Sequence, residues 1–252
     1  MLQLKKLILI EIRTYIKNSL TVFFSFLFPI FLMVIIMITT GNPEISNEYK
    51  LINKYVIISL IVGLVPLALL SFSISVAAEY EFGIIERLKL FGIEEKKILI
   101  AKVLVNLLVI TCQFVLIIGM AIFFRFEFPP VEKCTVFILC YLLAALSLFF
   151  IAWIIARILK KINRVQVVGM SFMFIILALS GAFGEFGKFP VGLERLCFFI
   201  PTYDLSSELT RYCLGENINV LIIIFKQISY NFLLIILMGL LSIKTRQSKI
   251  LR

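Results

Sequence analysis

Apolar stretches of about 20 residues recur along this chain of 252 residues and alternate with short charged connections. An α-helix rises about 1.5 Å per residue, so about 20 apolar residues cross the roughly 30 Å hydrocarbon layer of a bilayer. The chain is 62% hydrophobic and 16% charged, whereas soluble domains are about half apolar and about a quarter charged. The sequence therefore predicts an all-α polytopic membrane protein.

Hydropathy divides the chain into six transmembrane helices within one transmembrane domain, 1–252. The predicted spans are 20–39, 53–78, 98–124, 134–157, 165–183 and 219–243. An N-terminal interfacial helix (1–18), a coupling loop with a short helix (79–97) and an outer re-entrant segment (184–218) complete the layout. The N-terminus carries charge throughout and shows no small-residue cleavage site, so we expect no cleavable signal.

Lys and Arg are concentrated on one of two sets of connections. The N-terminus, 79–97, 158–164 and the C-terminus together hold more than twice as many as 40–52, 125–133 and 184–218. Because cytoplasmic loops keep an excess of Lys and Arg, we expect both termini and 79–97 to be cytoplasmic. The same rule explains the net charge of +10 without a nucleic-acid partner. As a separate expectation, the membrane is the cell membrane of a bacterium.

Residues 1–18 carry one basic and one apolar set of side chains at helical spacing. Lys6, Arg13 and Lys17 fall near one stripe, and a second stripe holds Leu4, Ile8, Ile12 and Ile16. This pattern favours an amphipathic helix lying on the membrane. The alternative is an ordinary basic flank of the first span.

The charged connection 79–97 contains a short segment bracketed by Gly83 and Gly92, residues suited to sharp reversals at helix ends. Between them, Ile84, Leu88 and Phe91 are spaced to share one face of a helix. A small helix with an apolar face and a charged back fits a groove in a cytoplasmic partner. A solvated loop is the alternative.

The sequence lacks residues and motifs that several kinds of chemistry require. The chain has no His, no GxxxxGK[ST] phosphate cradle and no carboxylate in the middle of a predicted span. Cation-coupled carriers usually need intramembrane acids, so the sequence offers no candidate residues for ion-driven transport. The five cysteines show no CxxC pairing, and only Cys197 and Cys213 share a predicted segment in which they could bridge.

The segment 184–218 is too rich in charge, Gly and Pro to be one span. Apolar residues at helical spacing before and after Pro201 favour two short outer-leaflet helices, and the alternative is a loop resting on headgroups. Glu208 and Arg211 can pair at i,i+3. Lys226 and Asn231 lie inside the sixth span; Lys226 faces a subunit interface or the substrate path, or the helix starts later. Helix-to-helix hydrogen bonding is the commoner use of Asn231.

The run EYEFGIIERLKLFGIEEKKILIAK, 79–102, resembles the segment after the second span in membrane subunits of ABC-2-type exporters. The matching positions are Glu79, Glu81, Gly83, Glu86, Leu88 and Lys102. The resemblance implies that this segment is the coupling helix that contacts the ATP-binding subunit. The contact would use Glu79, Glu81, Gly83, Ile84, Glu86, Arg87, Leu88, Phe91, Gly92 and Lys102. The sequence departs from the family pattern at Ile84, where Thr is usual, and at Gly92, near which many members carry Pro.

A second stretch, FFIPTYDLSSELTRYCLG at 198–215, resembles the family's segment before the last span. The resemblance implies an outer gate that includes Pro201, Tyr203, Arg211 and Gly215, and Glu208 joins it through its predicted pairing with Arg211. Lys226 and Asn231, as polar residues inside the sixth span, are candidates for the translocation path. The resemblance further implies a second permease subunit, identical or related, and two ATP-binding subunits. ATP and Mg²⁺ would bind on those subunits, and no cofactor or metal is expected in this chain.

The sequence thus predicts a non-enzymatic permease subunit that exports an amphiphile, such as a drug, an antimicrobial peptide or a lipid-linked molecule. The alternatives are a membrane scaffold or sensor whose loop recruits another protein, and an ATP-independent channel or carrier. The sequence does not select among the substrates, nor between a homodimer and a heterodimer.

Overall fold

A computed structural model describes residues 2–18, 22–40, 48–123, 130–180, 197, 200–213 and 215–250. Within these residues the regular structure is helical, and none of them forms a strand. The elements run in the order α1 (Leu2–Lys17), η1 (Phe23–Leu27), α3 (Phe28–Thr40), α4 (Glu48–Pro66), η2 (Leu67–Phe72), α5 (Ser73–Glu81), α6 (Ile84–Leu90), α7 (Glu95–Phe123), α8 (Val131–Leu159), α9 (Ile162–Leu179), α11 (Tyr203–Ser206), α12 (Glu208–Cys213) and α13 (Val220–Ile250).

Five helices among the described residues are long and apolar enough to cross a membrane. They are Val56–Glu81, Glu95–Phe123, Val131–Leu159, Ile162–Leu179 and Val220–Leu241. A shorter apolar helix, Ser25–Ile35, lies within the segment predicted as the first span. The chain is therefore a multi-pass helical membrane protein, as the apolar stretches predict.

Two π-helical segments accompany the prolines of the first two apolar segments. Segment η1 ends just before Phe28 and Pro29, and η2 begins just after Pro66. Proline lacks the backbone N–H and its ring crowds the carbonyl four residues earlier, which breaks an ordinary α-helix. In a π-helical turn each backbone hydrogen bond spans five residues instead of four. The helix from α4 through η2 to α5 consequently continues past Pro66 instead of ending there.

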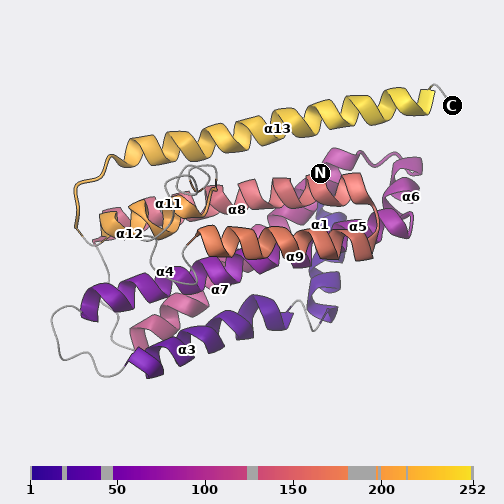
Figure 1. The fold of residues 1–252 in the computed structure, drawn as a ribbon. Helices are drawn as coiled ribbons and strands as arrows, with labels where there is room; N and C mark the ends of the chain where they lie inside the picture. Colours follow the sequence, from indigo (N-terminus) through magenta and orange to yellow (C-terminus); the bar gives the residue numbers. More distant parts are fainter. Residues whose placement is uncertain are drawn as a thin grey trace.

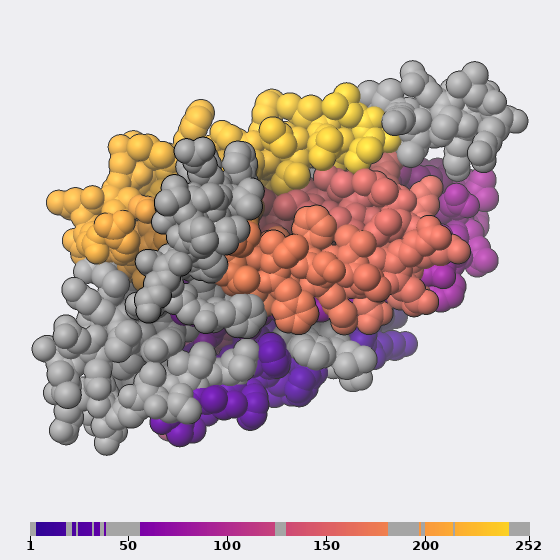
Figure 2. Space-filling view, viewed as in Figure 1, coloured from indigo at the N-terminus to yellow at the C-terminus, as the bar shows by residue number. Residues whose placement is uncertain are grey.

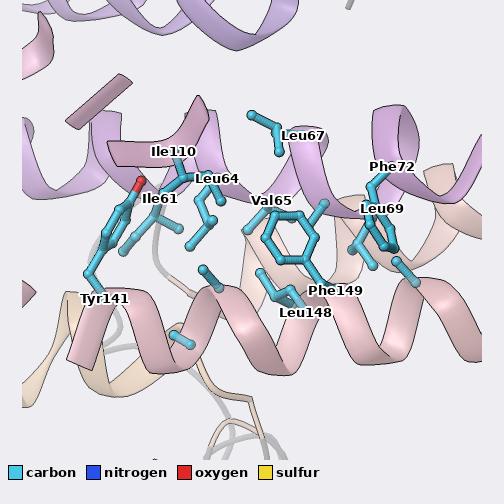
Figure 3. Close-up of a cluster of buried hydrophobic side chains, with 14 of the residues drawn as sticks. Ile61, Leu64, Val65, Leu67, Leu69, Phe72, Ile110, Tyr141, Leu148 and Phe149 are labelled. Atoms are coloured by element: carbon cyan, nitrogen blue, oxygen red, sulfur yellow. The ribbon is translucent and has the colours of Figure 1, made fainter. Parts of the chain in front are cut away.

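The span formed by α4, η2 and α5 lies at the centre of the bundle. In its most apolar part 72% of the residues are buried, compared with 17% for α13. Figure 3 shows its Leu64, Val65 and Phe72 facing Tyr141 and Phe149 of α8. The Phe72 and Phe149 ring centroids lie 4.9 Å apart, an arrangement typical of packed aromatic pairs.

The other helices surround this span. Helix α13 runs along α8 at the edge of the bundle and is well exposed on its outer side (Figures 1 and 2). Helix α9 packs closely on η2, because a Cβ at Gly169 would lie only 2.6 Å from the Leu69 carbonyl oxygen. Helix α1 crosses the direction of the long helices at the end of the bundle that carries α6 (Figure 1), which we call the α6 end.

Candidate coupling site

Three consecutive residues at the end of α5, Glu79, Tyr80 and Glu81, each bind a different part of the α6 end. Glu79 reaches Lys102 of α7, Tyr80 reaches the first residue of α7, and Glu81 reaches the start of α9. This short stretch therefore connects the central span to its neighbours on either side of α6.

Lys102 lies at the centre of a buried ionic cluster, which we call the Lys102 cluster. Its Nζ lies 2.7 Å from Glu11 Oε1, 3.0 Å from Glu79 Oε1 and 3.0 Å from Ser75 Oγ. Lys102 is only 1% exposed. The cluster joins α1, α5 and α7, and one ammonium group serves two carboxylates. Removing one partner of a buried ion pair typically costs about 3–5 kcal/mol, so these helices are held together firmly.

A second set of contacts meets at Glu95, the first residue of α7. The Tyr80 hydroxyl donates to Glu95 Oε1 at 2.7 Å, and Lys89 of α6 pairs with Glu95 Oε2. Arg157 of α8 lies 3.4 Å from Glu95 Oε1. The Tyr80 ring stands edge-on to Trp153 with centroids 6.3 Å apart. A carboxylate at a helix N-terminus is also favoured by the helix dipole. Glu95 therefore links α5, α6, α7 and α8.

Glu81 caps α9. The Ile162 N–H donates to Glu81 Oε2 at 2.7 Å, and the Lys161 side chain makes no capping hydrogen bond of its own. The first N–H groups of a helix have no partner within the helix, so an acceptor from another element stabilises its start. Glu81 thus ties the α8–α9 connection to α5.

Helix α6 is defined by the two glycines that bracket it. Gly83 and Gly92 have φ values of 67° and 76°, in the left-handed region that favours glycine. At the end of α6, the Gly92 N–H donates to Lys89 O and the Ile93 N–H donates to Leu88 O, both at 3.0 Å. These two bonds form a Schellman motif, which ends the helix sharply. The helical segment predicted between Gly83 and Gly92 is present.

Helix α6 packs on the bundle mainly through Ile85, a residue that the sequence pattern did not single out. Ile85 is fully buried and Leu88 is half-buried, whereas Ile84 and Phe91 are exposed. The three residues of the predicted apolar face differ in exposure, since Leu88 packs partly against the bundle while Ile84 and Phe91, which directly follows the last residue of α6, remain at the surface. Four large apolar side chains are left exposed, which we call the α6 patch: Phe82, Ile84, Leu90 and Phe91.

The remaining predicted coupling residues divide by location. Glu86 and Arg87 lie on the exposed surface of α6, beside the α6 patch. Glu79 and Lys102 point into the bundle and join helices. Sequence reasoning did not select Glu11, Ser75, Tyr80, Glu95 or Arg157. For Glu11 a signal existed, because it is the only acid of α1 and falls between Leu7 and Tyr15 on the half-buried face.

The opposite end of the bundle holds a second buried ion pair. Lys226 Nζ lies 2.8 Å from Asp204 Oδ1, and both side chains are largely buried. Gln227 Nε2 donates to Pro201 O at 2.7 Å and to Asp204 Oδ2 at 3.3 Å. Burial raises the pKa of Asp204, although the hydrogen bond from Lys226 opposes that shift. These contacts fasten α11 to α13.

The predicted path residues have partners inside the chain. Lys226 pairs with Asp204, and Asn231 Nδ2 donates to the carbonyl oxygens of Leu143 and Gln227, each at 2.9 Å. Helix α13 begins at Val220, so Lys226 does lie inside the helix.

The predicted outer-gate residues lie around these contacts. Pro201 is buried, Tyr203 begins α11 and Gly215 has a φ of 100°. The predicted Glu208–Arg211 pair is present at 3.8 Å, and Arg211 also pairs with Glu216 at 2.7 Å. The helical pattern after Pro201 forms two pieces, α11 and α12, with Leu205 and Leu209 buried.

Two further predictions concern this end. The helix predicted before Pro201 falls on 184–199, which, apart from Cys197, lies outside the described residues. Cys213 is a free cysteine, so the bridge to Cys197 that the sequence allowed is not formed. Among the described residues, no group of three or more Cys, Asp or Glu side chains could hold a metal ion.

Comparison with known families agrees with this architecture. The described helices and the linked α6 end define a multi-pass membrane protein with a short helix projecting from its bundle. The family model described as ABC-2 type transporter matches residues 2–205, and the chain therefore belongs to that family. The match includes α1, α6 and the whole Lys102 cluster. No curated protein and no solved structure matches the chain.

Family membership defines the general role of the chain. An ABC-2 membrane domain is the permease part of an ABC transporter and not its ATPase, and it works with an ABC ATPase as its partner. Residues 206–252, which include α12 and α13, lie beyond the matched part.

Proposed function

We propose that this chain is the permease subunit of an ABC exporter and that the α6 patch is the surface on which its ATPase subunit docks. In this arrangement six spans cross the membrane, both termini are cytoplasmic, and α6 projects into the cytoplasm. The basic charge of the connections at the α6 end supports this orientation, because Lys and Arg are retained on the cytoplasmic side.

The observation that carries the proposal is the exposure of large apolar side chains next to charged ones. Leu90 is 87% exposed and Phe91 is 80% exposed, and Glu86 and Arg87 lie beside them. Exposed apolar patches rimmed by polar residues are typical of protein interaction sites. A short helix that presents such a surface fits a groove of a partner protein.

The contacts around α6 supply a path for force. Lys89 holds α6 to Glu95, and Glu95 is bound in turn by Tyr80 and Arg157. The Lys102 cluster adds α1 to the same assembly through Glu11. A push on α6 would therefore move the ends of α5, α7 and α8 together, as rigid-body transitions require.

The full transporter would contain a second permease subunit, identical or related, and two ATPase subunits that bind ATP and Mg²⁺. Closure of the ATPases would move both α6 helices and open the central path alternately to each side. The first, second and fifth spans would line the subunit interface, and the segment around Pro201, Tyr203 and Arg211 would close the outer end. The apolar spans fit an amphiphilic substrate such as a drug, an antimicrobial peptide or a lipid-linked molecule.

Co-purification with an ABC ATPase subunit, sought first among the proteins encoded next to this chain, tests the docking surface. Burying Leu90 and Phe91 would contribute about 1.5–3 kcal/mol each, so Leu90→Ser with Phe91→Ser should weaken binding by about a hundredfold or more. The matched control is Phe123→Ser with Val131→Ser, at the opposite end, where the two side chains are 81% and 82% exposed. Equal retention of the ATPase by the two variants would contradict the proposal.

Transport measurements test the coupling separately. Reversing both charges, with Glu86→Arg and Arg87→Glu, leaves the buried contacts of α6 in place, so the chain should still insert and fold. We expect the complex to hydrolyse ATP without transporting substrate. Unchanged transport by this double variant would remove the role assigned to these residues.

A further inference from the structure

The exposed side of α1 carries a basic stripe that no carboxylate of the described residues neutralises. The stripe consists of Lys6, Arg13 and Lys17, spaced seven and four residues apart, and all three side chains are exposed. At 3.6 residues per turn, these spacings place them on one side of the helix. The sequence predicts this stripe, and the structure shows that it faces away from α7, on which α1 packs.

Apolar side chains flank the basic stripe. Leu9 and Ile16 are exposed on one side of it and Ile10 on the other, each more than half exposed. Ile16 belongs to the predicted apolar stripe with Leu4, Ile8 and Ile12, but only the other three lie on the half-buried side. The half-buried side follows Leu4, Leu7, Ile8, Glu11, Ile12 and Tyr15. Helix α1 thus has a packed face, a basic stripe and separate exposed apolar positions.

The position of α1 suits a membrane surface. It crosses the long helices at the α6 end (Figure 1), and in the proposed orientation this places it at the cytoplasmic leaflet. A helix with Lys and Arg beside exposed Leu and Ile lies in the interface, with its apolar side chains among the acyl chains. Anionic headgroups of that leaflet attract basic residues close to the surface.

We propose that the stripe formed by Lys6, Arg13 and Lys17 is a binding site for anionic phospholipid. The occupant is identified by charge complementarity, because three cations that pair with no carboxylate in the described part of the chain lie together where acyl chains can cover Leu9 and Ile16. The lipid holds the exposed side of α1 while Glu11, on the opposite side, pairs with Lys102. Anionic lipid therefore secures α1 against the coupling site. The inference rests on the proposed orientation and not on the transport function.

A tryptophan reporter on α1 tests this in vesicles that contain the full chain alone. Leu9→Trp places an indole beside the stripe, and the single native tryptophan, Trp153, is buried. Signal from the parent chain can therefore be subtracted. Fluorescence quenching is compared between vesicles in which phosphatidylglycerol carries bromine and vesicles in which phosphatidylcholine carries it. The ratio of quenching by brominated phosphatidylglycerol to quenching by brominated phosphatidylcholine gives the enrichment of anionic lipid at α1.

We expect strong enrichment at the Leu9→Trp reporter that falls at high salt. Each basic residue near the surface contributes about a fivefold preference, so Arg13→Gln should reduce the enrichment about fivefold. The triple variant Lys6→Gln, Arg13→Gln and Lys17→Gln should nearly abolish it. A reporter at Phe225→Trp, on the exposed side of α13 at the opposite end, should show no enrichment.

The control for charge is the variant Lys160→Asn, Lys161→Gln and Arg164→Gln, which removes three exposed cations from the α8–α9 connection and the first turn of α9, at the same end. It should leave enrichment at α1 unchanged. Equal quenching by both brominated lipids, or full enrichment in the triple α1 variant, would overturn the proposal. Absent enrichment combined with loss of ATPase co-purification in that triple variant would instead assign the stripe to a protein contact. Normal enrichment with failed ATPase docking would leave this inference standing and remove the proposed function.

Discussion

Replacing Lys102 with Met tests how strongly the Lys102 cluster holds α1, α5 and α7 together. Met retains most of the volume of the buried stem but removes the ammonium that serves Glu11 and Glu79 at 2.7 Å and 3.0 Å. Two carboxylates are then left facing each other without a cation. Breaking a buried pair in this way typically costs about 3–5 kcal/mol, so we expect strong destabilisation.

The predicted size can be measured by thermal unfolding. For chains of this length, about 1 kcal/mol corresponds to a Tm change of about 2–4 °C, so Lys102→Met should lower Tm by about 10 °C. The assay heats the detergent-purified chain and measures the fraction that still elutes as a folded species in size-exclusion chromatography. The control Lys161→Met changes an exposed lysine and should shift stability by no more than about 0.5 kcal/mol.

A triple variant separates charge from packing. Lys102→Met together with Glu11→Gln and Glu79→Gln removes every charge of the cluster, and replacing a whole buried ionic group is often nearly neutral. We therefore expect the triple variant to recover most of the Tm lost in Lys102→Met. The reasoning fails if Lys102→Met unfolds at the parent temperature, or if the triple variant is less stable than the single one.

Three further predictions concern other parts of the bundle. Gly63→Ala should destabilise the chain by about 1–3 kcal/mol, because the added Cβ would lie 1.6 Å from Gln113 Nε2 and 2.8 Å from Pro29 Cγ. Adding Gln113→Ala to Gly63→Ala should restore part of the lost Tm. A double variant with no higher Tm than Gly63→Ala would contradict this packing. Gly83→Ala should lower the free energy of unfolding by about 1 kcal/mol because of its positive φ, whereas Gly119→Ala, inside α7 with no atom near the added Cβ, should not lower it. The variant Lys226→Met should be more stable at pH 5 than at pH 8. Burial raises the pKa of Asp204 in the folded chain, so protonation of Asp204 favours folding and the stability falls as pH rises through that pKa. A Tm that does not change with pH would refute this.

The sequence was sufficient for the helical class, for five of the six predicted apolar spans and for the short helix between Gly83 and Gly92. Apolar length and glycine placement are local properties, so they can be recognised without knowing the packing. The orientation of α6 could not be predicted in this way, because Ile84 and Ile85 are equally apolar and only the contacts of the bundle bury Ile85. The exposure of Ile16 on α1 has the same cause.

The ion pairs show a similar limit. Lys102 and Lys226 were recognisable as cations inside apolar helices, but their partners lie far away in sequence. Glu11 is separated from Lys102 by 91 residues, and no local spacing rule connects the two. Asp204 was assigned to an outer segment, and its burial against α13 depends on how α11 packs. Chain topology, rather than local composition, brings these charges together.

Photo-crosslinking from α6 tests the central claim most directly. A photoreactive benzoylphenylalanine at position 91, where Phe91 is 80% exposed, is introduced into the assembled transporter, and the same group at position 123 provides the control. We predict that position 91 crosslinks to the ATPase subunit and that position 123 does not. A complex that turns over ATP while position 91 crosslinks only to lipid, or to no protein at all, would contradict docking at the α6 patch.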